Sequence, residues 1–415
     1  MAAGKRTRWT TAARVLALVL ASAAVSGAAR ADDAPACATV AEWISPQSQA
    51  VLAADTLMAT MSRRRVVLLG ENHANADHHR WQLHTMAALH GQRPNMIIGV
   101  EMLPRRAQPV LDRWVAGELT PEAFLEAVEW DTVWGFDPAL YLPLFHFARL
   151  QRIPMVALNV DRALITEVGE KGWEALPEES RQGVSTPAPA SEPYRRSLAG
   201  VHILKQHMHE GRPRPEEMPV SMPEEDLEKA ISDPAFKRFV EAQLTWDRAM
   251  AEVLAREARR SEQPLVVGLI GWGHLENRWG VPHQLASLGI DDVAVLLPWP
   301  QQQCANIAPT VADAVFLLDE QEGGASSQRP RLGVGVAPHR DGVQIVTISE
   351  GSVADAAGLA AEDIIVSVGG ISVRTVQDLV AVIQKQMPGA ALPMMVNRAG
   401  ATLNIVAQFP VSSAP

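Results

Sequence analysis

The chain has 415 residues, of which 47% are hydrophobic, and this length favours one large domain followed by a smaller one. Its formal charge is −10, and because the first 31 residues hold five basic and no acidic residues, the remainder carries 32 minus 47, or −15. An overall balance this acidic excludes an electrostatic nucleic-acid binder, which needs a cationic footprint.

The first 31 residues have the pattern of a signal peptide. Lys5, Arg6 and Arg8 form a basic region, residues 15–25 form a short apolar run, and Ala29-Arg30-Ala31 is a small-residue cleavage site. The run is too short to span a bilayer, and no later stretch approaches 18 apolar residues. We therefore expect an exported, periplasmic protein that is cleaved near Ala31 and has no transmembrane segment afterwards; an uncleaved anchor is the alternative.

Cys37 and Cys304 are the two cysteines of the chain, and Cys304 follows the last strand-like run of the first domain. In an oxidising compartment such a pair predicts a disulfide. The bridge would tie together the two ends of the first domain. The alternative is two free, buried thiols.

Residues 32–317 alternate short apolar runs with amphipathic stretches. The strand-like runs are 66–69, 96–100, 155–158, 265–270 and 293–297, and the helical stretches lie near 75–90, 105–128, 138–151 and 234–260. Runs without alternation are typical of strands buried on both faces. The pattern predicts an α/β fold with a largely parallel sheet and helices on both faces.

Two segments interrupt this pattern. Residues 161–233 are rich in proline and charge and contain no strand-like run, so we expect a helical cap inserted between two strands, or else a surface insertion without regular structure. Residues 318–330 have the composition of a linker. A small second domain is expected over 331–412.

Polar side chains follow three of the strand-like runs. The motif Gly-x-x-His occurs twice in this position, at 70–73 and at 271–274, and Glu101 directly follows a third run. Ligands collect at the carboxyl ends of parallel strands, so His73, His274 and the two glutamates Glu71 and Glu101 are expected to converge if their strands are neighbours. Imidazole and carboxylate groups held there suit a divalent metal or general acid–base chemistry.

These motifs resemble the ChaN-like haem-binding uptake family of the TIKI, TraB and EreA-like superfamily. The resemblance covers roughly residues 37–305 and rests on ordered matches at several strand ends. The matching positions are Gly70-Glu71-Asn72-His73, His78-His79, Gln82, Glu101, Trp134, Tyr141, Pro143, Asn159-Val160, Gly271-Trp272-Gly273-His274 and Gly280-Val281-Pro282.

The resemblance implies a haem-binding protein of haem or iron uptake that forms a homodimer around its ligand. Carried over to this chain, Tyr141 is the expected iron ligand, with His73, His274, His78 and Trp134 as further haem contacts. A tyrosinate suits ferric haem. The alternative for Tyr141 is a buried ring whose hydroxyl is hydrogen-bonded, in which case Tyr194, His207 or Met208 would be considered.

The TIKI branch of the superfamily implies a different function, a metal-dependent peptidase or hydrolase. Glu71, His73, Glu101 and His274 would then hold Mn, Co or Zn, and Glu71 or Glu101 would activate a metal-bound water. A scaffold with a vestigial site is a third alternative.

Residues 330–410 resemble a PDZ domain of the HtrA type. Leu332, Gly333 and Val334 match the loop that binds a peptide carboxylate, and Asp363-Ile364-Ile365 with Gly369-Gly370 matches a strand and hairpin. The usual Gly-Asp pair is replaced by Glu362-Asp363. The resemblance implies a binding module that recruits a peptide or protein C-terminus, which the hydrolase alternative would use to deliver substrates.

Overall fold

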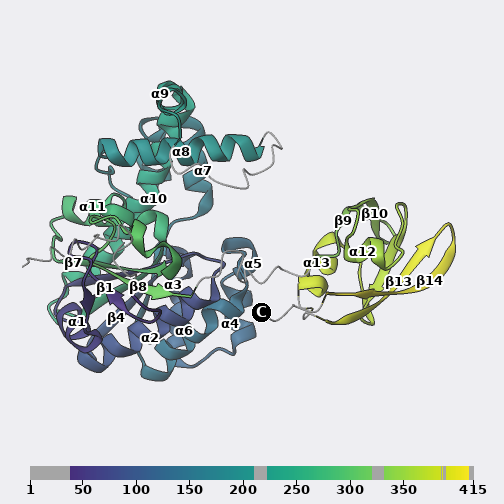
Figure 1. Cartoon of the computed structure of the whole chain (residues 1–415), viewed down its shortest axis with the longest axis horizontal. Helices are drawn as coiled ribbons and strands as arrows, with labels where there is room; N and C mark the ends of the chain where they lie inside the picture. Colours follow the sequence, from purple (N-terminus) through teal and green to yellow (C-terminus); the bar gives the residue numbers. More distant parts are fainter. Residues whose placement is uncertain (1–37, 210–221, 320–330, 385, 387–388, 411–415) are drawn as a thin grey trace, which may run out of the picture. The chain divides into compact units, whose positions relative to one another are not determined.

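The structure is a computed structural model that describes residues 38–209, 222–319, 331–384, 386 and 389–410. The expected signal peptide, Cys37 and most of the expected linker lie outside these residues. Figure 1 shows the elements and labels many of them. Within the described part of the chain, no helix is both long enough and apolar enough to cross a bilayer.

The first domain is built on an eight-stranded sheet whose core strands are parallel, as the sequence predicts. Short strands β1 and β2 add an antiparallel edge, because β1 pairs antiparallel with both β2 and β8. In sheet order the strands are β2 (Val51–Leu52), β1 (Trp43–Ile44), β8 (Ala314–Leu318), β7 (Val293–Pro300), β3 (Val66–Glu71), β6 (Leu265–Gly271), β4 (Met96–Pro104) and β5 (Met155–Asn159).

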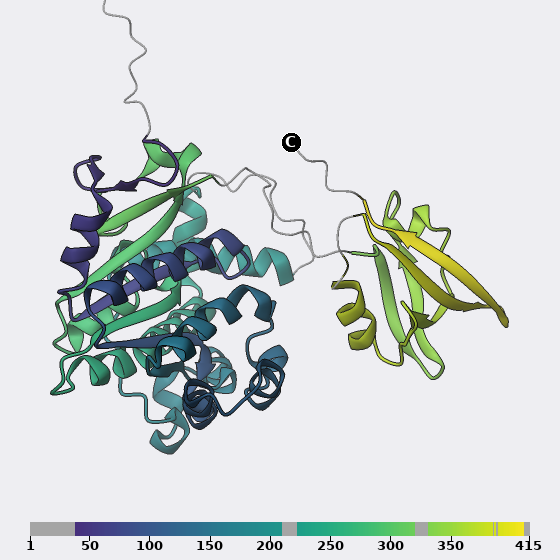
Figure 2. The same cartoon turned by 90° about the horizontal axis from the view of Figure 1, so that it is seen from below.

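Helices cover both faces of this sheet. Val67 and Leu69 of β3 face one core, while Val66 and Leu68 face the other. Against the first face lie α1 (Ala54–Met61), α2 (Ala76–Gln92), α3 (Gln108–Ala116), α4 (Pro121–Ala127), α5 (Trp130–Val133) and α6 (Pro138–Gln151), and against the second α10 (Pro234–Ala258) and α11 (Val281–Ser287). Figure 2 is seen from the side of the purple and blue helices. The central strands therefore lack a solvent face, which explains their unbroken apolar runs.

Local signals set where these helices begin. Asn75 caps α2 by accepting hydrogen bonds from the backbone N–H groups of Asp77 and His78. Asp137 caps α6 and Asp233 caps α10, and each is followed by proline at the first helical position, where a backbone N–H is not needed.

The segment 161–233 forms a helical cap, and residues 210–221 lie outside the described residues. It contains α7 (Arg162–Lys171), α8 (Glu192–His209) and α9 (Glu224–Ser232), which meet the first half of α10. Tyr194, Leu198 and Phe236 form one small core there, and Val168 and Trp173 belong to another. Because α10 continues from the cap onto the sheet, it connects the cap to the strand ends.

Cys304 lies between β7 and β8, in a 3₁₀ helix at Gln301–Asn306, so the expectation that it follows the last strand was wrong. The strand it precedes, β8, ends at Leu318, where the linker was expected to begin. Cys304 is buried, and the described residues include no free cysteine. The pairing with Cys37 stays a prediction: mature protein should show no free thiol when it is titrated under denaturing, non-reducing conditions, and two titratable thiols would contradict it.

The second domain has the antiparallel, β-rich architecture of a PDZ domain. Its sheet order is β14 (Ala401–Gln408), β13 (Ala391–Arg398), β11 (Ile364–Val368), β10 (Gly342–Ile348) and β9 (Val334–His339), with β12 (Ile371–Ser372) pairing to β11. Helices α12 (Val353–Ala356) and α13 (Val376–Gln384) complete it. The hairpin of β13 and β14 is the yellow ribbon in Figure 2.

Glu362 has a left-handed backbone, with φ of +71°, at the position where the family usually has glycine. A side chain in this conformation costs about 1 kcal/mol. We therefore expect Glu362→Gly to stabilise the second domain by up to about 1 kcal/mol, and Ala361→Gly, one residue earlier and without positive φ, to destabilise it. Hydrogen exchange of peptides from 331–409 measures both changes; a loss of protection in Glu362→Gly would contradict the assignment.

Candidate functional site

The sheet order places the three motif-bearing strands side by side. β6 lies between β3 and β4, so the three strands are neighbours, as convergence of their side chains requires. Glu71 and Gly271 are the last residues of β3 and β6, and they are paired in register. Glu101 lies within β4, and the backbone N–H of Gly271 donates to its Oε2 at 2.5 Å. The two Gly-x-x-His motifs and both glutamates therefore meet at one edge of the sheet.

His73 is held at this edge by a carboxylate and two aromatic rings. Its Nδ1 lies 2.7 Å from Oε1 of Glu71, which is buried. Trp134 and Phe136 pack against the imidazole, with ring centroids 4.7 and 5.1 Å away. Gly271 lies under the ring: a Cβ atom there would come within 2.6 Å of His73 Cε1. The His73 side chain nevertheless keeps 30% of its surface exposed, so it reaches solvent.

His274 occupies a more enclosed position with its own carboxylate. Its Nδ1 lies 2.5 Å from Oδ1 of Asp247, and its Nε2 lies 3.6 Å from Oε1 of Glu101. The other oxygen of Asp247 accepts a hydrogen bond of 2.9 Å from the hydroxyl of Tyr194. Gln243 also approaches His274, with its Nε2 3.1 Å from Nδ1. The cap thus contributes to the site through α8 and α10.

Asp247 and Gln243 were not predicted from the sequence. Both lie on α10, which was identified only as an amphipathic helix. A signal was present, because Thr245, Asp247 and Arg248 interrupt a helix segment that is otherwise apolar, and all three are buried. Buried polar side chains require partners, and here Asp247 finds His274 and Tyr194.

The carboxylates set the electrostatics of both histidines. Burial opposes protonation of His73, but the hydrogen bond with Glu71 and the charge of Glu101 outweigh it and raise the pKa of His73 above its usual value. Burial likewise opposes protonation of His274, and the charges of Asp247 and Glu101 again raise its pKa. By contrast, burial lowers the pKa of His79, which lies 3.5 Å from Glu71. At both motif histidines the neighbouring carboxylates therefore outweigh burial in their effect on the pKa.

Tyr141 is completely buried on α6. Its hydroxyl donates to the backbone carbonyl of His73 at 3.2 Å and lies 3.4 Å from Oε1 of Glu71, and its ring packs against His79. Burial and the charge of Glu71 raise the pKa of Tyr141 far above its usual value. This placement is the hydrogen-bonded alternative of the sequence analysis. An iron–phenolate bond would require both a lost proton and a movement of this ring.

Two further expected contacts occupy different positions. His78 is buried, and its Nδ1 accepts a hydrogen bond of 2.9 Å from the backbone N–H of Asn72, so it supports the loop that carries His73. Trp134 is half-buried beside His73, and its role as a haem contact stays a prediction. Gln82 donates to the backbone carbonyl of Leu69 and so anchors α2 on β3.

The expected divalent-metal site gains no support from this geometry. Among the described residues, no group of three or more His, Cys, Asp or Glu side chains is arranged to hold a metal ion. Within the same residues, Oε2 of Glu71 and Oε1 of Glu101 are buried and make no hydrogen bond. Each of these oxygens lies beside a histidine, Oε2 of Glu71 at 3.5 Å from Nε2 of His79 and Oε1 of Glu101 at 3.6 Å from Nε2 of His274, and could also accept a hydrogen bond from an added group.

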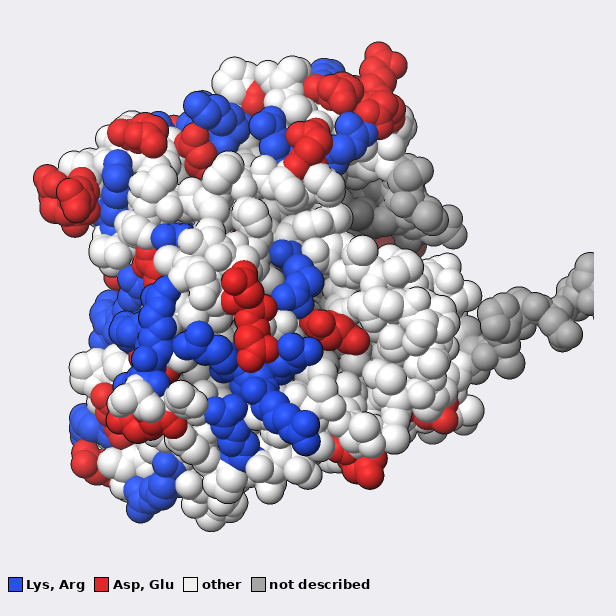
Figure 3. All heavy atoms as spheres, turned by 90° about the vertical axis from the view of Figure 1, so that its left-hand side faces the viewer, with Lys and Arg blue, Asp and Glu red and all other residues white. Residues whose placement is uncertain are grey.

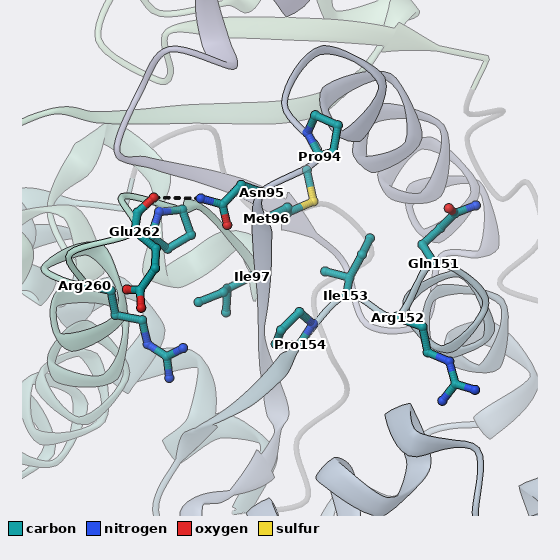
Figure 4. Close-up of a pocket in the computed structure, with 11 residues that line it drawn as sticks. Pro94, Asn95, Met96, Ile97, Gln151, Arg152, Ile153, Pro154, Arg260 and Glu262 are labelled. Atoms are coloured by element: carbon teal, nitrogen blue, oxygen red, sulfur yellow. Dashed lines mark hydrogen bonds between the residues drawn. The ribbon is translucent and has the colours of Figure 1, made fainter.

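A cavity of about 220 Å³ lies at the opposite end of the strands (Figure 4). Its lining residues precede or begin β4, β5 and β6, whereas His73 and His274 follow their strands. It is therefore separate from the site.

In the second domain, the expected carboxylate-binding loop leads into an edge strand. Leu332 is buried, Gly333 has φ of +79°, and Val334 begins β9. A side chain at Gly333 would collide with Ser352, because a Cβ atom there would lie 2.2 Å from the Cβ of Ser352. β9 pairs with β10 on one side, and α13 packs beside it. An edge strand next to a helix is the arrangement that accepts an added peptide strand.

The comparisons with known proteins agree with this architecture. The model of the family described as haem-binding uptake, Tiki superfamily, ChaN matches residues 57–285, and a PDZ domain model matches residues 344–398. The chain belongs to this ChaN haem-binding uptake family and carries a PDZ domain. No curated protein matches the chain.

Solved structures show similarity to the two parts separately. The structure of ChaN from Campylobacter jejuni, described by its cofacial heme binding, is 20% identical, with 66% of this chain and 95% of that chain covered and a TM-score of 0.48. The HtrA-type protease AlgW with a decapeptide is 19% identical over 21% of this chain and 30% of its own, with a TM-score of 0.19. A serine endoprotease from Yersinia pestis is 21% identical over 20% and 29%, with a TM-score of 0.18.

Proposed function

We propose that this chain is an exported, periplasmic haem-binding protein that takes part in haem or iron uptake, and that His73 is its iron ligand. Family membership supports haem as the ligand class. The observation that carries the assignment to His73 is its geometry: the ring reaches solvent, Nδ1 is held by buried Glu71, and two aromatic rings flank it.

The residues around His73 fit a haem. With Nδ1–H held by Glu71, Nε2 of the neutral imidazole is the nitrogen that would remain for iron, and a carboxylate on the far nitrogen orients such a ligand and increases its basicity. Trp134 and Phe136, which pack against His73, would offer aromatic surface to a haem held there. Haem bound there supplies an iron centre whose properties the axial ligand tunes. Tyr141 holds Glu71 and the His73 loop in place instead of binding iron.

Titration with haemin, followed by absorbance, tests this proposal on the mature full-length protein. We expect the unsubstituted protein to bind haemin, His73→Ala to weaken binding about tenfold or more, and Tyr141→Phe to keep the spectrum of the bound haem. Tyr141→Phe tests the phenol as an iron ligand: it removes only the hydroxyl group, so a lost contact with Glu71 and the His73 loop can lower the affinity while the spectrum of the bound haem stays the same.

The possible results distinguish the haem-binding function from the identity of the residue that binds the iron. If Tyr141→Phe abolishes the spectrum while His73→Ala retains it, the haem function stands and the assignment to His73 is wrong. If the unsubstituted protein binds no haemin, the proposed function itself is wrong. Fractionation of cells into cytoplasm and periplasm tests the export on which the uptake role depends.

We also propose that the PDZ domain recruits a partner through a peptide C-terminus, added as a strand along β9. The free edge of β9, the Leu332-Gly333-Val334 loop before it and α13 beside it support this mode. Peptides from a C-terminal library should bind with a free carboxylate and lose binding when that carboxylate is amidated. Equal binding of both forms would contradict recognition of the terminal carboxylate.

A further inference from the structure

The amino ends of the parallel strands carry a concentration of arginine that the function proposed above does not use. Parallel strands begin at the same edge, so the segments that lead into β3, β4, β5 and β6 meet there. We call this group the arginine edge: Arg63, Arg64, Arg65, Arg93, Arg152, Arg256, Arg259 and Arg260. Figure 3 shows Lys and Arg side chains gathered on one face of the molecule.

Much of this positive charge is not neutralised by carboxylates. The ion pairs recorded on the arginine edge join Arg64 to Asp292, and both Arg256 and Arg260 to buried Glu257. Glu262 and Asp291 are the other acidic residues in these segments. Within the described residues, five arginines of the edge have no ion-pair partner: Arg63, Arg65, Arg93, Arg152 and Arg259.

Backbone carbonyl groups hold several of these arginines in position. Arg65 donates to the carbonyl of Ala258 at 2.6 Å, and Arg152 donates to that of Val115 at 2.9 Å. Arg93 donates to the carbonyls of Ser62 and Arg64, both at 3.1 Å. A carbonyl fixes a guanidinium group without cancelling its charge. The edge is therefore an ordered positive surface on a chain whose overall charge is negative.

An exposed leucine lies near one of these arginines in the chain. Leu150, in the last turn of α6, is 78% exposed, which is the highest exposure among the large hydrophobic side chains that the structure describes. It is two residues from Arg152. Gln151 and Arg152 line the cavity of Figure 4 together with Arg260, so this turn of α6 borders the same edge. An exposed leucine two residues from Arg152 brings an apolar group to the end of α6 that borders the arginine edge.

We propose that the arginine edge and Leu150 dock this protein on an anionic lipid bilayer. Guanidinium groups bind phosphate oxygens in bidentate fashion, and the chain has no lysine between residues 38 and 170, so this surface uses arginine alone. The positive charge is spread over the starts of four strands. Several lipid headgroups of a bilayer could therefore be contacted at the same time. An apolar side chain beside such charges can enter the headgroup region.

Docking by this surface would orient the haem site. The arginine edge lies at the amino ends of the strands, and His73 and His274 lie at the carboxyl ends of the same sheet. A molecule held by the arginine edge therefore presents His73 away from the lipid surface, toward the aqueous compartment.

Co-sedimentation of the mature full-length protein with vesicles tests the proposal. We expect binding to phosphatidylcholine vesicles that contain phosphatidylglycerol, little binding to phosphatidylcholine alone, and loss of binding at about 1 M salt, where the screening length falls to roughly 3 Å. The combined variant Arg63→Gln, Arg65→Gln, Arg152→Gln and Arg259→Gln should reduce partitioning about tenfold or more. Arg162→Gln with Arg195→Gln, two exposed arginines of the cap, should leave it unchanged.

Leu150 gives an independent arm of the test. Leu150→Ser should weaken binding to the anionic vesicles and leave its salt dependence in place, whereas Ile371→Ser, at a 58% exposed residue of the PDZ domain, should have no effect. Unchanged tryptophan fluorescence shows that the first-domain variants are folded, and unchanged hydrogen exchange of peptides from 331–409 shows the same for Ile371→Ser. If the unsubstituted protein does not bind anionic vesicles, or if the arginine variant and the cap control lose binding equally, the proposal is wrong; retained haemin binding in either case leaves the proposed function intact.

Discussion

Gly271→Ala is expected to abolish or strongly weaken haem binding although it adds a single methyl group. The new Cβ atom would lie 2.6 Å from Cε1 and 3.1 Å from Nε2 of His73. The imidazole cannot yield freely, because Glu71 holds Nδ1 and Trp134 packs against the ring. Overpacking of this kind costs about 1–3 kcal/mol, and moving His73 away from its bonding position relieves it. We expect haemin affinity to fall about tenfold or more.

The same motif supplies the control for this variant. Gly273 is exposed, and a Cβ atom there would meet no atom within 4 Å. Gly271 has φ of −56°, so alanine there suffers from crowding alone and not from backbone strain. Haemin titration of Gly271→Ala and Gly273→Ala should therefore show a loss in the first and none in the second. Equal affinities in both variants would exclude His73 at its present position as the ligand.

The central part of the fold could be predicted from the sequence because buried parallel strands leave a clear pattern. The runs beginning at Val66, Met96 and Leu265 became β3, β4 and β6, and their neighbourhood brought His73, Glu101 and His274 together as expected. The useful signal was that these residues lie directly after a strand. In a parallel sheet the carboxyl ends of the strands lie at the same edge, so residues that follow neighbouring strands come close together.

Other parts of the fold leave weaker signals. β1 and β2 have two residues each, too few to show any periodicity, and β8 is a five-residue strand following an irregular segment. In the PDZ domain, Ala391–Arg398 alternates buried and exposed residues as an antiparallel strand should, yet Leu392, Met394 and Val396 are spaced by residues that are themselves apolar or small. The pairing of this strand with β14 depends on tertiary contacts that could not be predicted from the sequence pattern.

Side-chain partners were harder to foresee than strand ends. Tyr141 could be placed on a helix from the sequence, but its burial depends on how α6 meets α2, which brings His79 against its ring. Asp247 reaches His274 because α10 crosses from the cap to the sheet. The arginine edge was hidden for a similar reason, since its members are separated by up to about 200 residues and the total charge of the chain is negative.

Arg398→Met is expected to produce a large loss of stability confined to the PDZ domain. Asp363 is fully buried, and both its oxygens lie 2.7 Å from guanidinium nitrogens of Arg398. Removing the arginine leaves a buried carboxylate with the N–H of Ala360 as its remaining recorded donor. Breaking a buried pair in this way costs about 3–5 kcal/mol, and we expect the lower end, because Arg398 itself is 39% exposed.

The domain supplies a matched comparison. Arg340 pairs with Asp341 at 3.1 Å, but its side chain is 87% exposed, so Arg340→Met should cost well under 1 kcal/mol. All 11 tryptophans precede residue 300, so fluorescence reports on the first domain, and hydrogen exchange of peptides from 331–409 is the suitable measurement for the second. Equal loss of protection in the two variants would show that burial of Asp363 does not decide the effect.

The stability of the PDZ domain at acidic pH should also depend on the ion pair between Asp363 and Arg398. The hydrogen bonds from Arg398 lower the pKa of Asp363 below its unfolded value of 3.8, against an opposing effect of burial. A depressed carboxylate pKa contributes stability that is fully present well above the unfolded value and is lost as the pH falls through the folded value. PDZ protection should therefore fall as the pH drops below about 4. In the double variant Asp363→Asn with Arg398→Met, which has no buried charge, the drop should be smaller and part of the stability lost in Arg398→Met should return.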